Sequence, residues 1–229
     1  MTKMRIEKDL LGELEVPEDV YWGINTQRAL KNFQISQKRF PKIFLISLAQ
    51  VKKACLYANQ KLEVIDNDKA NTIEQAIDEL LIEHKFLEQF PVDVFQTGSG
   101  TQINMNMNEV LSNRANEILG FPKGKKTPIH PNDHINKSQS SNDVIPTAMH
   151  LSTIVEVKDE LLPSLKELIE ILKEKIKQFD KIVKVGRTHL QDAVPIKLST
   201  EFSVYKKQIE VANQRLEQAL DELYEIPIG

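Results

Sequence analysis

Apolar residues recur at helical spacing through most of the chain. After Pro41 they alternate steps of four and three, which places them on one face of a helix. A polar turn at Asp66, Asn67 and Asp68 precedes a second apolar series. We therefore predict two antiparallel helices joined by a short turn. Their apolar positions are Phe44, Leu48, Val51, Cys55, Ala58 and Leu62, and then Ile73, Ile77, Leu80, Leu81 and Leu87.

The last third of the chain carries a longer four-three repeat. It runs from Leu151 to Phe179 and resumes from Leu198 to Leu223, after a stretch at 180–197 that we predict to be a loop. Pro163 removes one backbone hydrogen bond, so we expect a kink there rather than a stop. Repeats of this kind form narrow seams for bundle packing. Two such helices cannot bury their apolar surface as a pair, and they need further helices from this chain or from other copies.

The remaining segments lack this periodicity. The first 40 residues are predicted to be irregular, and residues 91–103 break the helical pattern. A third helix is predicted from about Asn104 to Leu119, with Gly120 placed to end it. Residues 121–142 are polar and contain three prolines. An irregular stretch of this length in a compact chain is usually functional or disordered.

Composition supports a mostly α-helical fold of one or two domains within the 229 residues. Aromatic residues make up 6% and glycine contributes only 8 residues, a profile that favours long helices with aliphatic seams over a sandwich of short strands. We expect helices and irregular segments over residues 1–142, and two long helices over residues 143–229.

Charge and hydropathy exclude several classes of protein. The formal net charge of -3 argues against a strongly basic nucleic-acid binder. No apolar run approaches the roughly 18 residues of a membrane span, and the N-terminal stretch shows no apolar core of a signal peptide. With the single cysteine, Cys55, an intramolecular disulfide is impossible. We expect a cytoplasmic chain that contacts neither membrane nor nucleic acid.

Three irregular segments concentrate chemistry. Thr97–Gln102 feeds a helix N-terminus, where exposed amides and the helix dipole favour an anion; a flexible capping loop is the plainer interpretation. His130–Asp143 holds two His, three Asn, two Asp, three Ser and one Lys, and Asp143 is a candidate helix cap. Capping explains one or two of these residues, and a metal site at His130, Asp133 and His134 matches no strong ligand spacing.

The third segment, Gly186–Asp192, contains His189, a candidate acid or base because histidine titrates near neutral pH. A structural or solvated histidine is the alternative. Together the three segments supply hydroxyl, amide and backbone donors, which suit a small dicarboxylate. The sequence shows no dinucleotide-binding fingerprint, no Walker loop and no nucleophile elbow.

These motifs closely resemble class II fumarate hydratase, a member of the aspartase/fumarase superfamily. The resemblance covers essentially the whole chain, and motifs this long in this order are highly specific. Aspartate ammonia-lyase is the nearest alternative: it typically has Gln where this chain has His189, although Asp133-His134 leans towards it. The matching segments are Glu7–Gly12, Trp22–Arg28, Gln96–Gln102, Asn104–Val110, His130–Asp133, Asn136–Asp143 and Gly186–Asp192.

The resemblance implies reversible hydration of fumarate to (S)-malate, in the citric acid cycle, by a homotetramer whose active site combines several subunits. It implies no metal or organic cofactor. It also implies an N-terminal helical lyase domain over residues 1–142, with irregular active-site segments, followed by the first two long helices of a central bundle over residues 143–229. His189 is assigned to proton transfer, through a water. Substrate binding is assigned to Ser99, Gly100, Thr101, Ser140, Ser141, Asn142 and Thr188, and a second dicarboxylate site to His130, Pro131, Asn132 and Asp133.

The chain also departs from the family pattern. The family's later loop, which carries a catalytic serine and a substrate-binding lysine, is absent, so we predict that this chain alone is inactive. Thr127 and Pro128 stand where the family has a basic residue before the second dicarboxylate site. A non-catalytic helical assembly module is a further alternative. Intact Ser99, Thr101 and His189 argue against it, as does Asn142.

Overall fold

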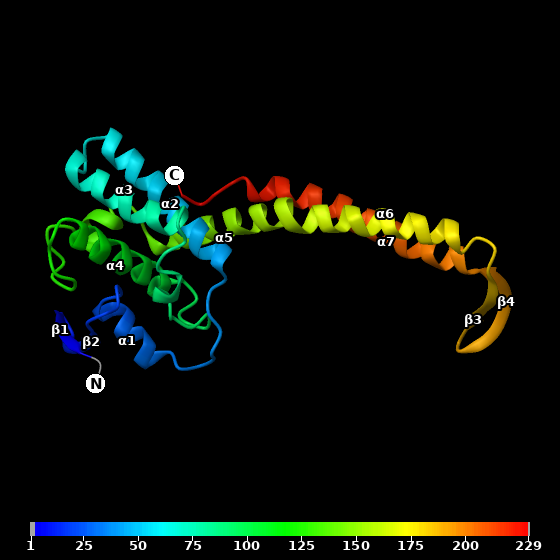
Figure 1. The fold of residues 1–229 in the computed structure, drawn as a ribbon, viewed down its shortest axis with the longest axis horizontal. Helices are drawn as coiled ribbons and strands as arrows, with labels where there is room; N and C mark the ends of the chain where they lie inside the picture. Colours follow the sequence, from blue (N-terminus) through cyan, green and yellow to red (C-terminus); the bar gives the residue numbers. More distant parts are fainter. Residues whose placement is uncertain (1–2, 229) are drawn as a thin grey trace. The chain divides into compact units, whose positions relative to one another are not determined.

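The computed structural model describes residues 3–228, which are mostly helical, as predicted (Figure 1). They divide into two compact units. The first reaches to Ser152 and is joined by residues 226–228, and the second is Thr153–Glu225. The division falls inside helix α5 (Ser141–Glu156), ten residues after the boundary predicted from the sequence. Within the described residues, none of the helices is long and apolar enough to cross a membrane.

The first unit begins with a β-hairpin, so the expectation of an irregular start is wrong. Strands β1 (Met4–Asp9) and β2 (Gly12–Pro17) pair antiparallel, and helix α1 (Ile24–Asn32) follows. In the first strand the inward positions are polar rather than apolar, because Glu7 is buried while Ile6 is 70% exposed. An apolar pattern therefore could not indicate this strand.

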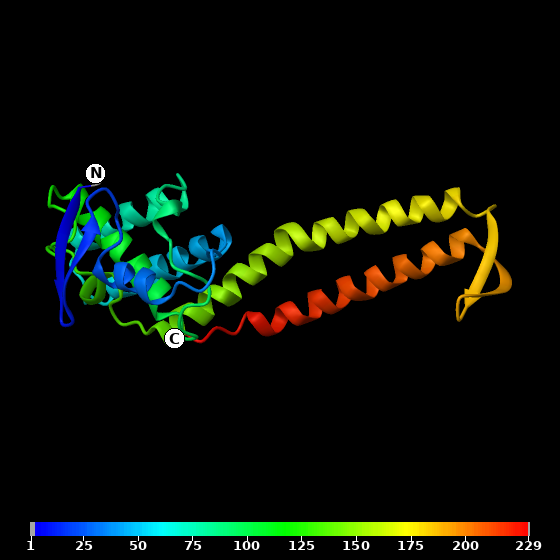
Figure 2. The same ribbon diagram turned by 90° about the horizontal axis from the view of Figure 1, so that it is seen from below.

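The core of the first unit forms where helices α2 (Lys42–Lys61), α3 (Asn67–Leu81) and α4 (Thr101–Ile118) pack with the start of α5 (Figures 1 and 2). The predicted pair of helices at α2 and α3 is confirmed, and Asp66 caps α3 by accepting the Lys69 amide at 2.9 Å. Helix α4 begins three residues before the predicted Asn104. Fully buried members of the core include Leu48, Ile73, Ile77, Leu80, Ile103 and Met107.

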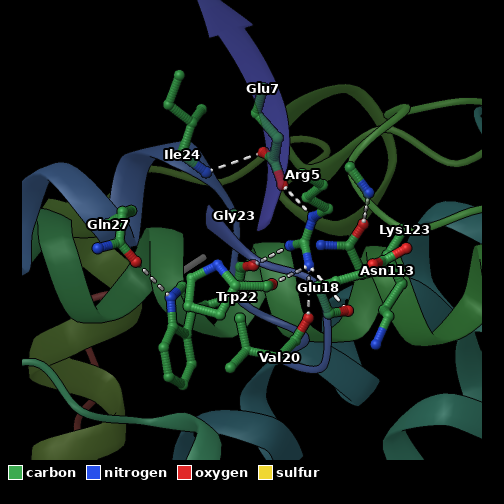
Figure 3. A network of polar contacts seen from close by, with 12 residues as sticks. Arg5, Glu7, Glu18, Val20, Trp22, Gly23, Ile24, Gln27, Asn113 and Lys123 are labelled. Carbon is green, nitrogen blue, oxygen red and sulfur yellow. Dashed lines mark hydrogen bonds and ion pairs between the residues drawn. The ribbon is translucent and has the colours of Figure 1, made fainter. Parts of the chain in front are cut away.

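Two charged side chains hold the N-terminal segment: Arg5 ties it together internally, and Glu109 fastens it to the core. Arg5 donates to the carbonyl oxygens of Pro17, Val20 and Trp22 at 2.6, 2.9 and 2.6 Å (Figure 3). The buried Glu109 carboxylate of α4 accepts five hydrogen bonds of 2.7–3.0 Å from residues at the start of α1. Their donors are the backbone amides of Gly23, Asn25 and Thr26 and the side chains of Asn25 and Thr26.

In the second unit, helix α6 (Leu162–Gln178) lies beside helix α7 (Leu198–Leu223) (Figure 1). The Phe179 ring packs edge-on against that of Phe202, with ring centroids 5.0 Å apart. A π-helical segment, Val157–Leu161, precedes α6, so the helix continues past Pro163 rather than stopping. Such a segment shifts the backbone hydrogen bonds by one residue, which accommodates the missing proline donor.

The predicted loop at 180–197 is instead an antiparallel hairpin. Strand β3 (Val183–Thr188) pairs with β4 (Gln191–Lys197), and the register shifts between Val185 and Arg187. A Cβ at Gly186 would lie 2.8 Å from the Val194 carbonyl oxygen, so the strands approach too closely there for a larger residue. The alternation of Val183 and Val185 is the sequence signal for this strand, and it is short enough to pass for loop sequence.

Candidate functional site

Two helices of the first unit begin side by side and present a cluster of hydroxyl groups. The Thr101 hydroxyl at the start of α4 lies 3.2 Å from the Ser99 hydroxyl and 3.3 Å from the Ser141 hydroxyl at the start of α5. Ser99 and Thr101 are exposed and Ser141 is half-buried. We name these three residues the hydroxyl cluster. They were predicted from separate segments, and the structure brings them together.

The glycine before Thr101 allows this approach. Gly100 has φ +68°, a conformation that favours glycine, and a Cβ there would lie 2.8 Å from the Ile145 side chain of α5. Because Gly100 has no side chain, α5 packs directly against the start of α4. Any larger residue would separate the two helix starts.

Ser140 and Asn142 flank Ser141 at the start of α5. The Ser140 carbonyl accepts from the amides of Asp143 and Val144 at 3.1 and 3.0 Å, and its hydroxyl accepts the Asn142 amide at 3.3 Å. Ser140 thus caps α5, and the expectation that Asp143 is the cap is wrong because Asp143 lies in the first turn. The side chains of Ser140 and Asn142 are exposed. Helix-start amides and dipoles of this kind favour bound anions.

A pocket of about 160 Å³ adjoins Thr101 between α1 and α4. Its polar lining from α1 was not predicted, because the apolar pattern of the first 40 residues indicates no helix there. The charged residue of this lining, Arg28, already forms two hydrogen bonds to the Asp9 carboxylate, at 2.8 and 2.7 Å. The lining residues are Asn25, Arg28, Ala29, Asn32, Phe33, Thr101, Gln102 and Met105.

The predicted second dicarboxylate segment forms a tight turn in which the two histidines accept backbone hydrogen bonds. His130 Nδ1 accepts the amides of Asn132 and Asp133 at 3.2 Å each, and His134 Nδ1 accepts the His130 amide at 2.9 Å. Burial and then the charge of Lys69 on α3 lower the pKa of His134, which keeps its ring a neutral acceptor.

The remaining residues of that segment present both buried and exposed groups. Pro131 is buried at the start of a π-helical turn, Pro131–Ile135, while the side chains of Asn132 and Asp133 are exposed. The Asp133 carboxylate lies 3.3 Å from His130 Nδ1. Across residues 3–228, no group of three or more His, Cys, Asp or Glu side chains is arranged to hold a metal ion.

Thr188 and His189 belong to the second unit. Thr188 ends β3, and the two-residue turn His189-Leu190 has φ values of +49° and +62°. Both central residues of a tight hairpin turn need positive φ, which costs a side-chain-bearing residue some strain. The exposed His189 imidazole is therefore presented at a hairpin tip.

Comparison with known proteins shows what this arrangement resembles. A family described as lyase matches residues 12–229. A class II fumarate hydratase of Thermosynechococcus vestitus is 51% identical over 228 residues, and one of Rickettsia prowazekii is 49% identical over 229 residues. These alignments cover the whole of this chain, whereas they cover 49% and 50% of the two relatives' lengths. The chain thus spans about half the length of the curated relatives it matches.

Solved structures agree with the sequence relatives. A fumarate lyase:delta crystallin from Brucella melitensis has a TM-score of 0.92 at 42% identity, covering 98% of this chain and 52% of that one. A recombinant class II fumarase from Schistosoma mansoni has a TM-score of 0.91 at 40% identity, covering 99% of this chain and 48% of that one. The resemblance inferred from the motifs is confirmed, and the chain belongs to the lyase family.

Proposed function

We propose that this chain is part of a class II fumarate hydratase and contributes one side of a site that interconverts fumarate and (S)-malate. The observation that carries the proposal is the hydroxyl cluster, in which the hydroxyls of Ser99 and Ser141 lie 3.2 and 3.3 Å from the Thr101 hydroxyl at two adjoining helix starts. Neutral hydroxyls combined with helix-start amides bind carboxylates without the cost of burying a cation. The class II fumarate hydratases that cover the whole chain support this choice of reaction.

The proposed chemistry requires stabilisation of a carbanion. When the C3 proton of malate leaves, negative charge spreads into the neighbouring carboxylate as an aci-carboxylate. Preorganised donors aimed at that carboxylate lower the barrier by several kcal/mol. The hydroxyl cluster, Gly100, Ser140 and Asn142 are assigned to binding, with Thr188. His189 is assigned to proton transfer through a water.

The rest of the assignment is also proposed. His130, Pro131, Asn132 and Asp133 form the second dicarboxylate site. Four copies assemble into a homotetramer, which would cover the half-exposed seams of α6 and α7 and bring segments of several subunits together. The protein acts in the cytoplasm, in the citric acid cycle. Without the family's later serine and lysine loop, the 229-residue chain alone forms no malate.

The test supplies the part of the relatives' length that this chain does not span. The C-terminal portion of the Thermosynechococcus vestitus relative is supplied as a second chain or fused after Gly229, and fumarate is added in ammonium buffer. We expect NMR to detect malate and no aspartate. Aspartate as the product would establish an aspartate ammonia-lyase instead, and no turnover from a folded complex would support a non-catalytic module. Malate formation by the purified 229-residue chain would refute the predicted inactivity.

Variants then test the hydroxyl cluster. Thr101→Val and Ser141→Ala each remove one hydroxyl, and we expect each to lower kcat/KM by about 100- to 1000-fold, as the loss of a donor to developing charge does. Ser164→Ala is the matched control, because its exposed hydroxyl donates only to the Glu160 carbonyl of its own helix, at 2.8 Å. Equal activity of all three variants would remove the cluster from the mechanism.

A further inference from the structure

Lys52 lies at the centre of a buried polar cluster in the first unit. Its side chain comes from α2 and is 1% exposed. Its Nζ donates to Asn136 Oδ1 at 2.8 Å and to Gln139 Oε1 at 2.9 Å, and none of the described carboxylates pairs with it. Burying a cation among neutral amides is expensive, so a lysine at such a position calls for a reason.

The same amide oxygen joins a third element to the cluster. Asn136 Oδ1 also accepts from the side-chain amides of Asn104 and Asn108 on α4, at 3.1 and 3.2 Å. The side-chain oxygens of Asn104 and Asn108 are buried without a partner among the described residues. The convergence of the two side-chain amides on Asn136 thus leaves the side-chain oxygens of Asn104 and Asn108 without a hydrogen-bond partner in the described part of the chain.

The turn at residues 136–139 is closed on itself and fastened to α2. The side-chain amide of Asn136 donates to the Gln139 carbonyl at 3.1 Å, and the side-chain amide of Gln139 donates to the Ile135 carbonyl at 3.0 Å. Asn59, also on α2, donates to the Lys137 carbonyl at 2.9 Å. This turn leads directly into Ser140, so its position determines where α5 begins.

We propose that Lys52 is a positioning residue for the dicarboxylate site: by holding the turn at 136–139 against α2 and α4, it sets the position of Ser140, Ser141 and Asn142 relative to Thr101. The inference rests on the proposed function of the hydroxyl cluster. Lys52 itself touches no substrate. It acts through Asn136 and Gln139.

The protonation state of Lys52 gives this brace a measurable signature. Burial lowers the pKa of Lys52 to about 7, so the amine changes charge near neutral pH. The titratable neighbour is Cys55 on α2, whose thiol pKa burial raises, while the groups facing Lys52 from α4 and from the turn are neutral amides. A charged ammonium makes stronger hydrogen bonds than a neutral amine. The turn is therefore held more tightly below pH 7 than above it.

The first experiment is NMR of the 229-residue chain from pH 5.5 to 9. We expect the Lys52 side-chain signal and the backbone amides of Gln139–Asn142 to titrate with one shared midpoint near 7. Lys52→Met should abolish that transition. Lys53→Met is the matched control and should keep it, because Lys53 is half-exposed and pairs with Asp78 and Glu74 at 2.7 and 3.1 Å. Amides that stay constant while Lys52 titrates would overturn the proposal. A Lys52 that remains charged to pH 9 would overturn only the pH dependence, and the KM measurement below would then decide the positioning role.

The unsubstituted chain decides the question by itself if Lys52→Met does not fold. Where the variant folds, the restored two-part enzyme gives a second measurement. We expect Lys52→Met to raise KM for fumarate about tenfold with a smaller change in kcat, and to lose an inflection near pH 7 that Lys53→Met retains. Unchanged KM in folded Lys52→Met would overturn the brace. Failure of the unsubstituted enzyme to make malate would instead overturn the proposed function and leave the NMR result standing.

Discussion

The two compact units bury their apolar side chains to very different extents. In the first unit a continuous cluster includes Leu48 and Ile77, each 0% exposed. In the second unit the buried hydrophobic residues among those described are Leu162, Ile169 and Leu220, at 7–8%. Both units use similar apolar periodicity. The comparison shows that such a seam closes into a core only when several helices meet, and stays half-buried when two helices pack as a pair.

The polar residues differ in the same way. The first unit contains buried hydrogen-bond networks: that of Lys52 holds the turn before Ser140, and that of Glu109 holds the start of α1. The second unit presents Thr188 and His189 on an exposed hairpin. The first unit therefore preorganises its half of the proposed site, whereas the second depends on whatever packs against its seam.

Among these predictions, the largest change in the free energy of unfolding should come from removing Glu109, the buried carboxylate that fixes the start of α1. Glu109→Ala leaves the amides of Gly23, Asn25 and Thr26 without their acceptor, and we expect a loss of about 4 kcal/mol in the free energy of unfolding. Urea unfolding followed by the single tryptophan, Trp22, measures it. Glu13→Ala, at an exposed residue, is the control. A loss below 1 kcal/mol for Glu109→Ala would contradict the assigned role.

A matched pair of truncations tests the comparison directly. Leu48→Ala opens a cavity in a closed core and should cost about 3 kcal/mol, whereas Leu172→Ala in the half-buried seam should cost about 1 kcal/mol. Amide hydrogen exchange read separately in each unit gives the two losses. Equal losses would show that the second unit has a closed core of its own, and the comparison would fail.

A smaller change in the free energy of unfolding depends on pH and comes from Glu79 in the first unit. The Glu79 carboxylate accepts from Arg114 Nε and Nη2 at 2.7 Å each, and these hydrogen bonds lower the pKa of Glu79. The folded state therefore favours the carboxylate. The resulting stability is present above the ordinary value of 4.5 and is lost as pH falls through the depressed folded pKa.

We expect that contribution to be about 1.5 kcal/mol, the range of hydrogen bonds to charged groups. Urea unfolding between pH 3 and 6 measures it, with Glu79→Gln expected to flatten the pH dependence by this amount. Glu13→Gln, on an exposed strand position, should leave it unchanged. A Glu79→Gln curve that parallels the unsubstituted chain would exclude Glu79 as the source.

Helices could be predicted from the sequence because burial follows their period. The apolar residues at the four-three positions of α5 and α6 are all buried or half-buried, whereas Leu168 and Ile171, off that face, are exposed. The four-three positions are Leu151, Val155, Leu162, Leu165, Ile169, Leu172, Ile176 and Phe179. Both hairpins were missed for physical reasons. In β1 the inward side of the strand carries Arg5 and Glu7, so no apolar alternation marks it. In β3 and β4 nearly every residue is exposed, so burial imposes little pattern.

The members of the hydroxyl cluster could be named from the sequence, Ser99 and Thr101 because they precede a helix and Ser141 through the family resemblance, but their meeting could not. The brace behind it could not be predicted, because it depends on which segments meet in space. Lys52 did leave one signal: it lies four residues after Leu48, on the apolar face of α2. A lysine on a buried face must find oxygen acceptors, and which acceptors they are follows only from the tertiary fold.

The smallest expected effect concerns the hairpin tip of the second unit. Leu190 has φ +62° and is 92% exposed, so its side chain adds strain and little packing. Leu190→Gly relieves about 1–2 kcal/mol of strain and loses about 0.5–1 kcal/mol of backbone entropy, for a net gain of about 0.5 kcal/mol. Amide exchange in β3 and β4 should slow about twofold. Val194→Gly, within β4 at ordinary extended geometry, should speed exchange instead. Faster exchange in Leu190→Gly would mean that the leucine side chain holds the turn, and that packing as well as backbone geometry positions His189.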